Sequence, residues 1–166
     1  MIAMEAALTG HLVLTTLHTN DAPSALTRLQ EMDVEAYLVA SGIDCVVAQR
    51  LLRKLCDRCR EPYEPNEAQL AAAGFPEYQW RDIPQLHRAV GCSNCTKTGY
   101  KGRIGLYEVM LMSEEIERMT VERASSEAIR SLAIEQGMKT LREDGLEKVR
   151  LGITSVDEII RVTGTV

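Results

Sequence analysis

The sequence predicts an α/β fold, and three observations support that class. Residues 12–17 (LVLTTL) form a continuous apolar and β-branched run, which is typical of a strand buried on both faces. The residues after this run carry apolar side chains at helical spacing, beginning with Ala22, Leu26 and Leu29. From Ser113 onward the composition favours helices. A strand followed by helices is the unit from which α/β domains are built.

The first elements can be placed from local signals. Residues 1–8 have the pattern of the middle of a helix, with no capping residue before them. Asn20 or Asp21 is expected to cap the helix that follows the strand, with a proline in its first turn. A further helix is predicted near Glu35–Ile43, whereas the pattern of Val46–Leu55 fits a strand and a helix equally well.

The remaining chain divides by composition into three further segments. Residues 56–102 hold four of the five prolines and the only tryptophan, which predicts an inserted subdomain of loops with one short helix around Glu67–Ala73. Residues 103–112 are predicted to be a strand that returns to the core. Residues 113–166 form the helical region, and residues 1–55 are the α/β part.

Capping residues mark the helices of the C-terminal region. Ser113 and Ser125 are each expected to begin a helix, and a third helix is predicted over about Lys139–Leu151. The segment Thr154–Asp157 carries the S/T-x-x-D/E pattern that caps a last helix.

The overall composition excludes several classes of protein. The chain has 166 residues with 45% apolar and 26% charged residues, and its net charge is −5. An acidic balance argues against a broad nucleic-acid-binding surface. No apolar run approaches the roughly 20 residues that cross a bilayer. No basic segment followed by an apolar one marks a secretory signal at the N-terminus.

Four of the five cysteines form two C-x-x-C pairs, Cys56 with Cys59 and Cys92 with Cys95. Each pair places two sulfurs on one tight turn, and two such turns close a tetrahedral S4 site that suits Zn²⁺. A closed S4 site has no open position, so the predicted zinc is structural. The alternative is a set of reduced thiols without metal, or a redox pair. Cys45 is expected to be a buried small apolar residue.

The predicted strand 12–17 ends in polar residues. The carboxyl edge of an open α/β sheet is where such folds bind ligands, and His18 would lie at that edge. An imidazole there could contact a phosphate oxygen or orient a water. The alternative is that His18 and His11 only satisfy hydrogen bonds of the core or of turns.

No complete catalytic motif accompanies these histidines. The string closest to the phosphate loop G-x-x-x-x-G-K-[ST] runs over residues 91–98, but Thr96 stands where the second glycine is required. The segment Gln49–Lys54 could place an arginine at a phosphate or at a subunit interface, although a solvated charged surface is the preferred explanation.

Four ordered motifs together resemble the secretion ATPases that drive type II secretion and type IV pilus assembly. They are residues 7–22 (ALTGHLVLTTLHTNDA), 46–59 (VVAQRLLRKLCDRC), 91–110 (GCSNCTKTGYKGRIGLYEVM) and 137–164 (GMKTLREDGLEKVRLGITSVDEIIRVTG). The tetracysteine insertion favours the secretion and pilus-assembly branch over the retraction ATPases. Lys97 stands where relatives often have glycine.

The resemblance implies a partial RecA-like P-loop ATPase core with a tetracysteine zinc insertion and a C-terminal helical region. In such a core His18 would approach the γ-phosphate of ATP and its Mg²⁺, and His11 would be the second histidine of the same box. Arg50 lies in a matching segment and is a candidate nucleotide-binding residue. The implied parent is a cytoplasmic homo-hexamer, peripheral to the inner membrane, whose partners are a membrane platform and secretion or pilus assembly proteins.

One departure from the family is large, because the Walker A loop, the acidic boxes and the N-terminal domain are all missing from these 166 residues. Without the phosphate loop, this chain alone is expected neither to hydrolyse ATP at a useful rate nor to bind it tightly. The competing hypotheses are a stand-alone zinc-containing interaction module without catalytic activity, and a zinc-dependent nucleic-acid or chaperone module, which the acidic balance disfavours.

Overall fold

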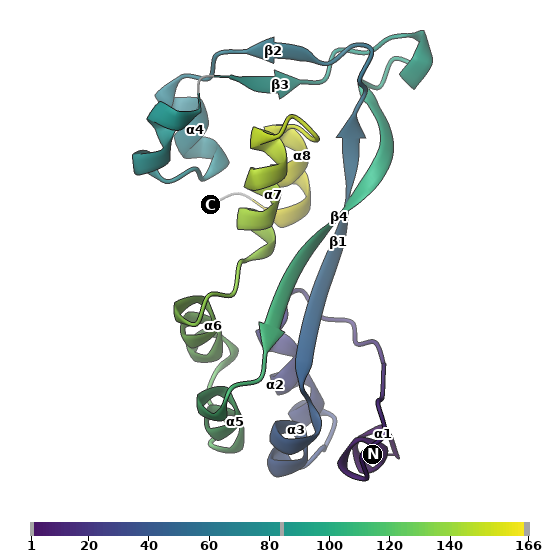
Figure 1. Ribbon diagram of the computed structural model, residues 1–166, viewed down its shortest axis with the longest axis vertical. Coiled ribbons are helices and arrows are strands. Elements are labelled where there is room, and N and C mark those ends of the chain that lie inside the picture. Colours follow the sequence, from purple (N-terminus) through teal and green to yellow (C-terminus); the bar gives the residue numbers. More distant parts are fainter. Residues whose placement is uncertain (1, 84, 165–166) are drawn as a thin grey trace. The chain divides into compact units, whose positions relative to one another are not determined.

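The computed structural model describes residues 2–83 and 85–164. The chain divides into two compact units. The first unit contains the residues up to Gln49 together with Tyr107–Thr140, and the second contains Arg50–Leu106 together with the residues from Leu141 onward. The long strands β1 (Cys45–Leu55) and β4 (Tyr100–Leu111) pair with each other, run in opposite directions, and contribute residues to both units (Figure 1).

The first unit is mainly helical. Its helices pack α1 on α3, α3 on α5, α2 on α6 and α5 on α6. Their bounds are α1 Ile2–Leu8, α2 Pro23–Glu31, α3 Ala36–Gly42, α5 Glu114–Val121 and α6 Ser126–Glu135. The side chains that fill its core include Leu26, Val39, Met110, Ile116 and Ile129, all of which are buried. Removal of these apolar surfaces from water is the main stabilising contribution to the unit.

Local signals placed these helices correctly. The side chains of Ser113 and Ser125 accept hydrogen bonds from backbone N–H groups in the first turns of α5 and α6, as predicted. Asp21 has the same role at α2, where its Oδ1 accepts from the N–H of Ser24 at 2.9 Å. The proline of that turn, Pro23, is the first residue of the helix. Each cap satisfies a donor that the helix itself leaves without a partner.

The predicted buried strand over residues 12–17 is wrong. This segment has no regular secondary structure, and the side chains of Leu12 and Leu14 are 85% and 88% exposed. The apolar run predicted burial between neighbouring strands, but the described residues supply no strand that pairs with it. A strand cannot form alone, because its backbone hydrogen bonds come from its neighbours.

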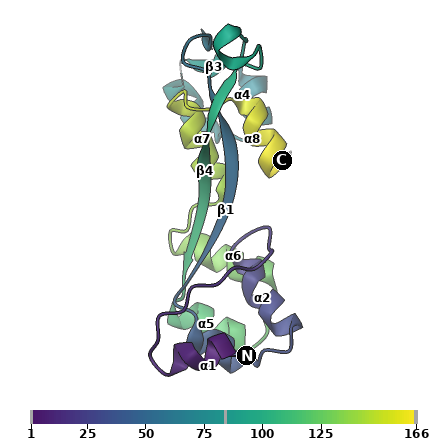
Figure 2. The same cartoon turned by 90° about the vertical axis from the view of Figure 1, so that its right-hand side faces the viewer.

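The second unit contains residues 50–55 of β1 and residues 100–106 of β4. A short hairpin pairs β2 (Glu61–Tyr63) antiparallel with β3 (Leu86–Arg88), so that Pro62 lies opposite His87. The helices α7 (Leu141–Arg150) and α8 (Val156–Thr163) pack together and lie side by side in Figure 1, and Figure 2 shows them from a second direction. The unit also contains α4 (Glu67–Ala73) and two 3-10 turns, η1 (Glu77–Asp82) and η2 (Ser93–Cys95).

One contiguous apolar core holds this second unit together. Its buried members come from β1, α4, β3, β4, α7 and α8 and from the loop positions Phe75 and Ile83, and Trp80 packs against them from η1. The core is close-packed at Gly145, where a Cβ would lie 2.6 Å from a side-chain carbon of Ile159. The buried residues are Leu52, Leu70, Ala73, Phe75, Ile83, Leu86, Leu106, Leu146, Val149 and Ile159.

The structure tests the predicted elements between residues 45 and 112. The short helix Glu67–Ala73 is confirmed, and a capping box closes its first turn. Residues 103–111 of the predicted strand 103–112 lie in β4, and the ambiguous segment Val46–Leu55 is a strand. Cys45 is exposed and not buried, because alternation along β1 places its side chain on the same exposed face as Val47.

The described residues therefore form a mixed α/β structure whose sheets are two-stranded. A RecA-like core and the four-segment division at residues 55, 102 and 112 stay predictions. None of the described helices has the length and apolar character needed to span a bilayer.

Candidate metal centre

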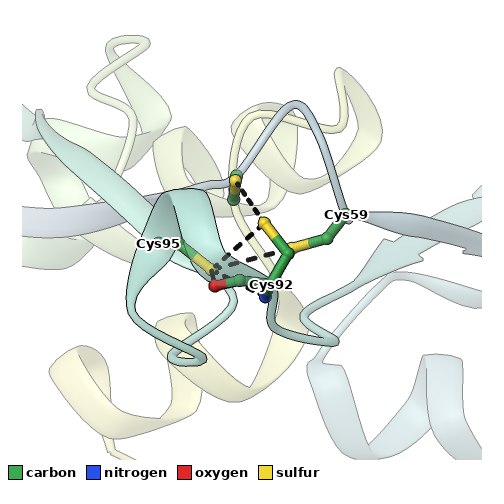
Figure 3. A group of neighbouring side chains, drawn as sticks. Cys59, Cys92 and Cys95 are labelled. Carbon is green, nitrogen blue, oxygen red and sulfur yellow. Dashed lines mark hydrogen bonds between the residues drawn. The ribbon is translucent and has the colours of Figure 1, made fainter.

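The four paired cysteines lie together in the second unit. The Sγ atoms of Cys56 and Cys92 are 3.9 Å apart, and those of Cys59 and Cys95 are 3.8 Å apart. The Sγ atoms of Cys92 and Cys95 are also 3.9 Å apart, and all four sulfurs lie within 4.8 Å of one another. Figure 3 shows the side chains of Cys59, Cys92 and Cys95 pointing toward one another. All five cysteines of the chain are free of disulfides.

These separations fit a tetrahedral zinc site. With a Zn–S bond of about 2.3 Å, the edge of an S4 tetrahedron is about 3.8 Å long. Three of the sulfur pairs match this edge at 3.8–3.9 Å. The donor set of four thiolates also suits Zn²⁺ and excludes hard cations such as Mg²⁺ and Ca²⁺, which prefer oxygen ligands.

Local backbone structure aims the sulfurs inward. In each C-x-x-C pair the chain turns tightly, and the N–H of the second cysteine donates to the carbonyl of the first, at 3.1 Å for Cys59 and 3.3 Å for Cys95. Lys97 follows in the left-handed region with φ of 61°, which explains why glycine would suit this position. Gly99 is required by space, since a Cβ there would lie 2.6 Å from that of Ala89.

Backbone N–H groups surround the sulfurs as a second layer. The N–H of Gly91 donates to Cys59 Sγ at 3.3 Å, and the N–H groups of Cys92 and Gly99 each donate to Cys95 Sγ at 3.2 Å. Such donors stabilise thiolates and orient them toward a metal. The side-chain amide of Asn94 adds a weaker contact to Cys56 Sγ at 3.5 Å.

Hydrogen bonding and burial shift the thiol pKa values of the cluster in opposite directions. The N–H donors of Cys92 and Gly99 lower the pKa of the Cys95 thiol to about 6. Desolvation instead raises the pKa of Cys59 to about 12, despite the donor from Gly91. Metal binding to four thiolates would displace the protons that remain on the cysteines, and the positive ion would balance the charges of the sulfurs.

The structure places the other predicted site residues outside this cluster. His11 is exposed, with its Nδ1 3.1 Å from the hydroxyl of Thr9. His18 is exposed on the same irregular segment, and Arg50 is half-buried on β1. Their nucleotide roles stay predictions.

Two buried carboxylates were missed by sequence reasoning. Glu108 on β4 accepts a hydrogen bond from the N–H of Ala22 at 2.8 Å, and Glu158 on α8 accepts from Arg53 and Arg161. Glu108 carries no sequence signal beyond its place among apolar strand residues. Glu158 had one, because it lies three residues after Ser155 in a capping pattern, and the side chain of Ser155 accepts from its N–H.

Comparison with known proteins identifies the family. The chain is 43% identical to the type IV pilus assembly ATPase PilB of Thermus thermophilus, over 98% of this chain and 18% of that protein. It is 45% identical to PilB of Acinetobacter baylyi, over 98% of this chain and 28% of that protein. It is 42% identical to the type II secretion system ATPase E of Vibrio cholerae, over 98% of this chain and 31% of that protein.

The chain thus spans between about a fifth and a third of the length of these relatives. The family model described as type II/IV secretion system protein matches residues 1–161, nearly the whole chain. The chain therefore belongs to the type II/IV secretion system protein family.

Proposed function

We propose that this chain is the C-terminal part of a hexameric ATPase motor that powers type II protein secretion or type IV pilus assembly. The observation that carries the proposal is the family match over residues 1–161, together with identities of 42–45% to proteins named as pilus assembly and secretion ATPases. The proposed parent works at the cytoplasmic face of the inner membrane, where it acts on a membrane platform and on the assembly proteins.

The tetracysteine cluster serves this motor as a structural element. Cys56 and Cys59 close the end of β1, whereas Cys92 and Cys95 precede β4, and 32 residues separate the two pairs. A zinc ion bound by these residues would fix both ends of that excursion at once. The ion would supply charge balance and a cross-link, and four sulfur ligands leave no position for a substrate.

Nucleotide chemistry in the parent would draw on the first unit. We propose that His18 contacts the γ-phosphate region and its Mg²⁺, with His11 as its companion and Arg50 as a further nucleotide-binding residue. The 166 residues contain no G-x-x-x-x-G-K-[ST] loop, and the backbone cradle and lysine of that loop position and neutralise the phosphates. The chain by itself is therefore expected to show no ATP turnover.

The test begins with the DNA upstream of the Met1 codon. An open frame that encodes a phosphate loop and an acidic strand would supply the longer product, whose zinc-loaded form is then assayed for ATP hydrolysis. We expect His18→Ala to reduce turnover strongly, whereas Thr15→Ala, an exposed residue of the same segment, leaves it unchanged.

A stop codon immediately before Met1 would favour the second candidate, a stand-alone zinc-containing interaction module without catalytic activity. The specific observation behind that candidate is the closed sulfur cluster in a chain that has no phosphate loop. ATP hydrolysis by the 166-residue chain itself, lost in His18→Ala, would contradict the expectation that the chain is inactive alone. That result would also contradict the hypothesis of a non-catalytic interaction module.

A further inference from the structure

A second polar site lies in the second unit, where three arginines line one pocket of about 270 Å³. Arg53 comes from β1, Arg103 from β4 and Arg161 from α8, and Leu51 and Leu52 form the apolar part of the wall. None of these residues belongs to the cysteine cluster, and none is His11, His18 or Arg50, although Arg53 lies in the segment Gln49–Lys54 for which the sequence left open an arginine at a phosphate. The convergence of three cationic side chains from separate elements calls for a physical explanation.

Two of the three arginines are held by one buried carboxylate. Glu158 is fully buried, and its Oε2 accepts from Nε and Nη2 of Arg53 at 3.0 Å and 2.7 Å. Nε of Arg161 donates to the same oxygen at 2.8 Å, and its Nη2 donates to Oε1 at 2.5 Å. The backbone N–H of Arg53 completes the set at 2.8 Å. Each guanidinium therefore presents its edge to Glu158.

This arrangement leaves the Nη1 groups of Arg53 and Arg161 without a hydrogen-bond partner among the described residues. Both side chains are about half exposed, at 44% and 53%. Guanidinium donors that are fixed in direction and open to solvent form a preorganised receptor for an anion, because little side-chain entropy remains to be lost on binding.

A contact with an aromatic ring also holds the guanidinium of Arg53 in place. Its Cζ lies 4.2 Å from the centre of the Tyr100 ring, a cation–π contact. The hydroxyl of Tyr100 is in turn 2.7 Å from Oγ of Ser155, which caps α8. The position of this guanidinium is therefore determined by a carboxylate, a ring and a helix cap together.

Arg103 gives the pocket its excess charge. Among the described residues it makes no hydrogen bond and no ion pair, although it lines the same pocket. Three guanidinium groups and the single carboxylate of Glu158 leave a net charge of about +2 at neutral pH, since arginine stays protonated there. A monocarboxylate would balance half of that charge, whereas a phosphate group carries about −1.5 to −2.

We infer that this pocket binds the phosphate group of a small phosphorylated ligand or of inorganic phosphate. The tetrahedral oxygens would accept from the free Nη1 groups of Arg53 and Arg161 and from the guanidinium of Arg103. Guanidinium–phosphate pairs are charge-assisted and frequently bidentate, which makes arginine the suited side chain for such a group. Leu51 and Leu52 would contact the apolar part of a phosphate ester. The inference does not depend on the proposed ATPase function.

The experiment titrates the zinc-loaded chain with inorganic phosphate at pH 7 and constant ionic strength, and follows the arginine Nε–Hε signals by NMR. We expect saturable shifts at the signals of Arg53, Arg103 and Arg161. Arg103→Gln should weaken the binding about tenfold, because it removes a charged donor that the fold does not use. The matched control is Arg88→Gln, which removes an exposed arginine paired with Glu61 and should leave the affinity unchanged.

Glycerol 3-phosphate and AMP serve as further ligands in the same titration. Tighter binding of either ligand than of inorganic phosphate supports the inference. Preference for glycerol 3-phosphate would indicate a lipid-headgroup type of ligand, and preference for AMP would indicate a nucleotide. Shifts that do not saturate, or an affinity that Arg103→Gln and Arg88→Gln change equally, would overturn it. Trp80 fluorescence verifies that each variant remains folded, since this residue packs against the core of the same unit.

Discussion

The substitution Glu158→Gln tests whether the buried carboxylate stabilises the second unit. The amide keeps the shape of the side chain but removes the negative charge that Arg53 and Arg161 share. Two guanidinium groups would then face each other across a neutral group that cannot accept at both of its terminal atoms. We expect a clear loss of stability, because breaking a buried ion pair leaves charge without compensation.

The magnitude follows from the pKa of Glu158. Burial alone would raise that pKa, but hydrogen bonds from Arg161 and Arg53 outweigh burial and lower it from 4.5 to about 2. At about 1.4 kcal/mol per pH unit, this difference corresponds to about 3 kcal/mol. Water screens the half-exposed arginines, so we expect a loss of about 2 kcal/mol.

The pH dependence of the stabilisation by Glu158 determines the pH at which unfolding should be measured. The folded pKa lies below that of the unfolded chain, so the stabilisation is complete above about pH 4.5 and is lost as the pH falls toward 2. Urea unfolding of the zinc-loaded chain at pH 7 therefore measures the full effect. Trp80 is the only tryptophan and lies in the second unit, so its fluorescence reports that unit.

We expect the urea midpoint to fall by about 1 M for Glu158→Gln, if the denaturant dependence is about 2 kcal/mol per M. The control is Glu61→Gln, which removes an exposed carboxylate whose ion pair with Arg88 should contribute less than about 1 kcal/mol. Equal midpoints for the two variants would refute the reasoning that this buried charge stabilises the unit.

Two further predictions concern the second unit. Metal analysis of the purified chain should give one zinc per chain. Cys95→Ser should lower this zinc content, whereas Cys45→Ser should leave it unchanged. Equal zinc contents in the two variants would contradict the assignment of an S4 site. Burial and the nearby Arg60 lower the pKa of His87 from 6.5, and its Nδ1 is buried without a hydrogen-bond partner among the described residues. Because the unfolded chain then binds a proton more readily, the urea midpoint should fall as the pH drops below about 6.5, and less steeply in His87→Leu. Identical slopes of midpoint against pH would argue against a role for this imidazole, since any acid release of zinc is common to both proteins.

Features that depend on neighbouring residues in the chain were predictable from the sequence. The caps at Ser113 and Ser125 and the helix Glu67–Ala73 were found because side chain and backbone interact within one turn. The four-cysteine cluster was found because two C-x-x-C turns restrict the sulfurs to few arrangements, although the 35 residues between partners such as Cys56 and Cys92 carry no such signal.

Features that depend on distant partners were not predictable. Residues 12–17 carry the apolar pattern of a buried strand, yet burial requires neighbouring strands that the described residues do not supply. The ambiguity of Val46–Leu55 was resolved by pairing with β4, which supplies the backbone hydrogen bonds of a strand. Alternation within that strand then decided that Cys45 is exposed.

The sequence by itself determined the class of fold, the starts of most helices, the four-cysteine cluster and the family resemblance, because each depends on local patterns or ordered motifs. Only the tertiary structure decided that Arg53 and Glu158, 105 positions apart in the sequence, are in contact and that Arg103 lines the same pocket as Arg53. The physical reason is that a single charged residue has no periodicity, so its partner is set by the packing of strands and helices that bring it into reach.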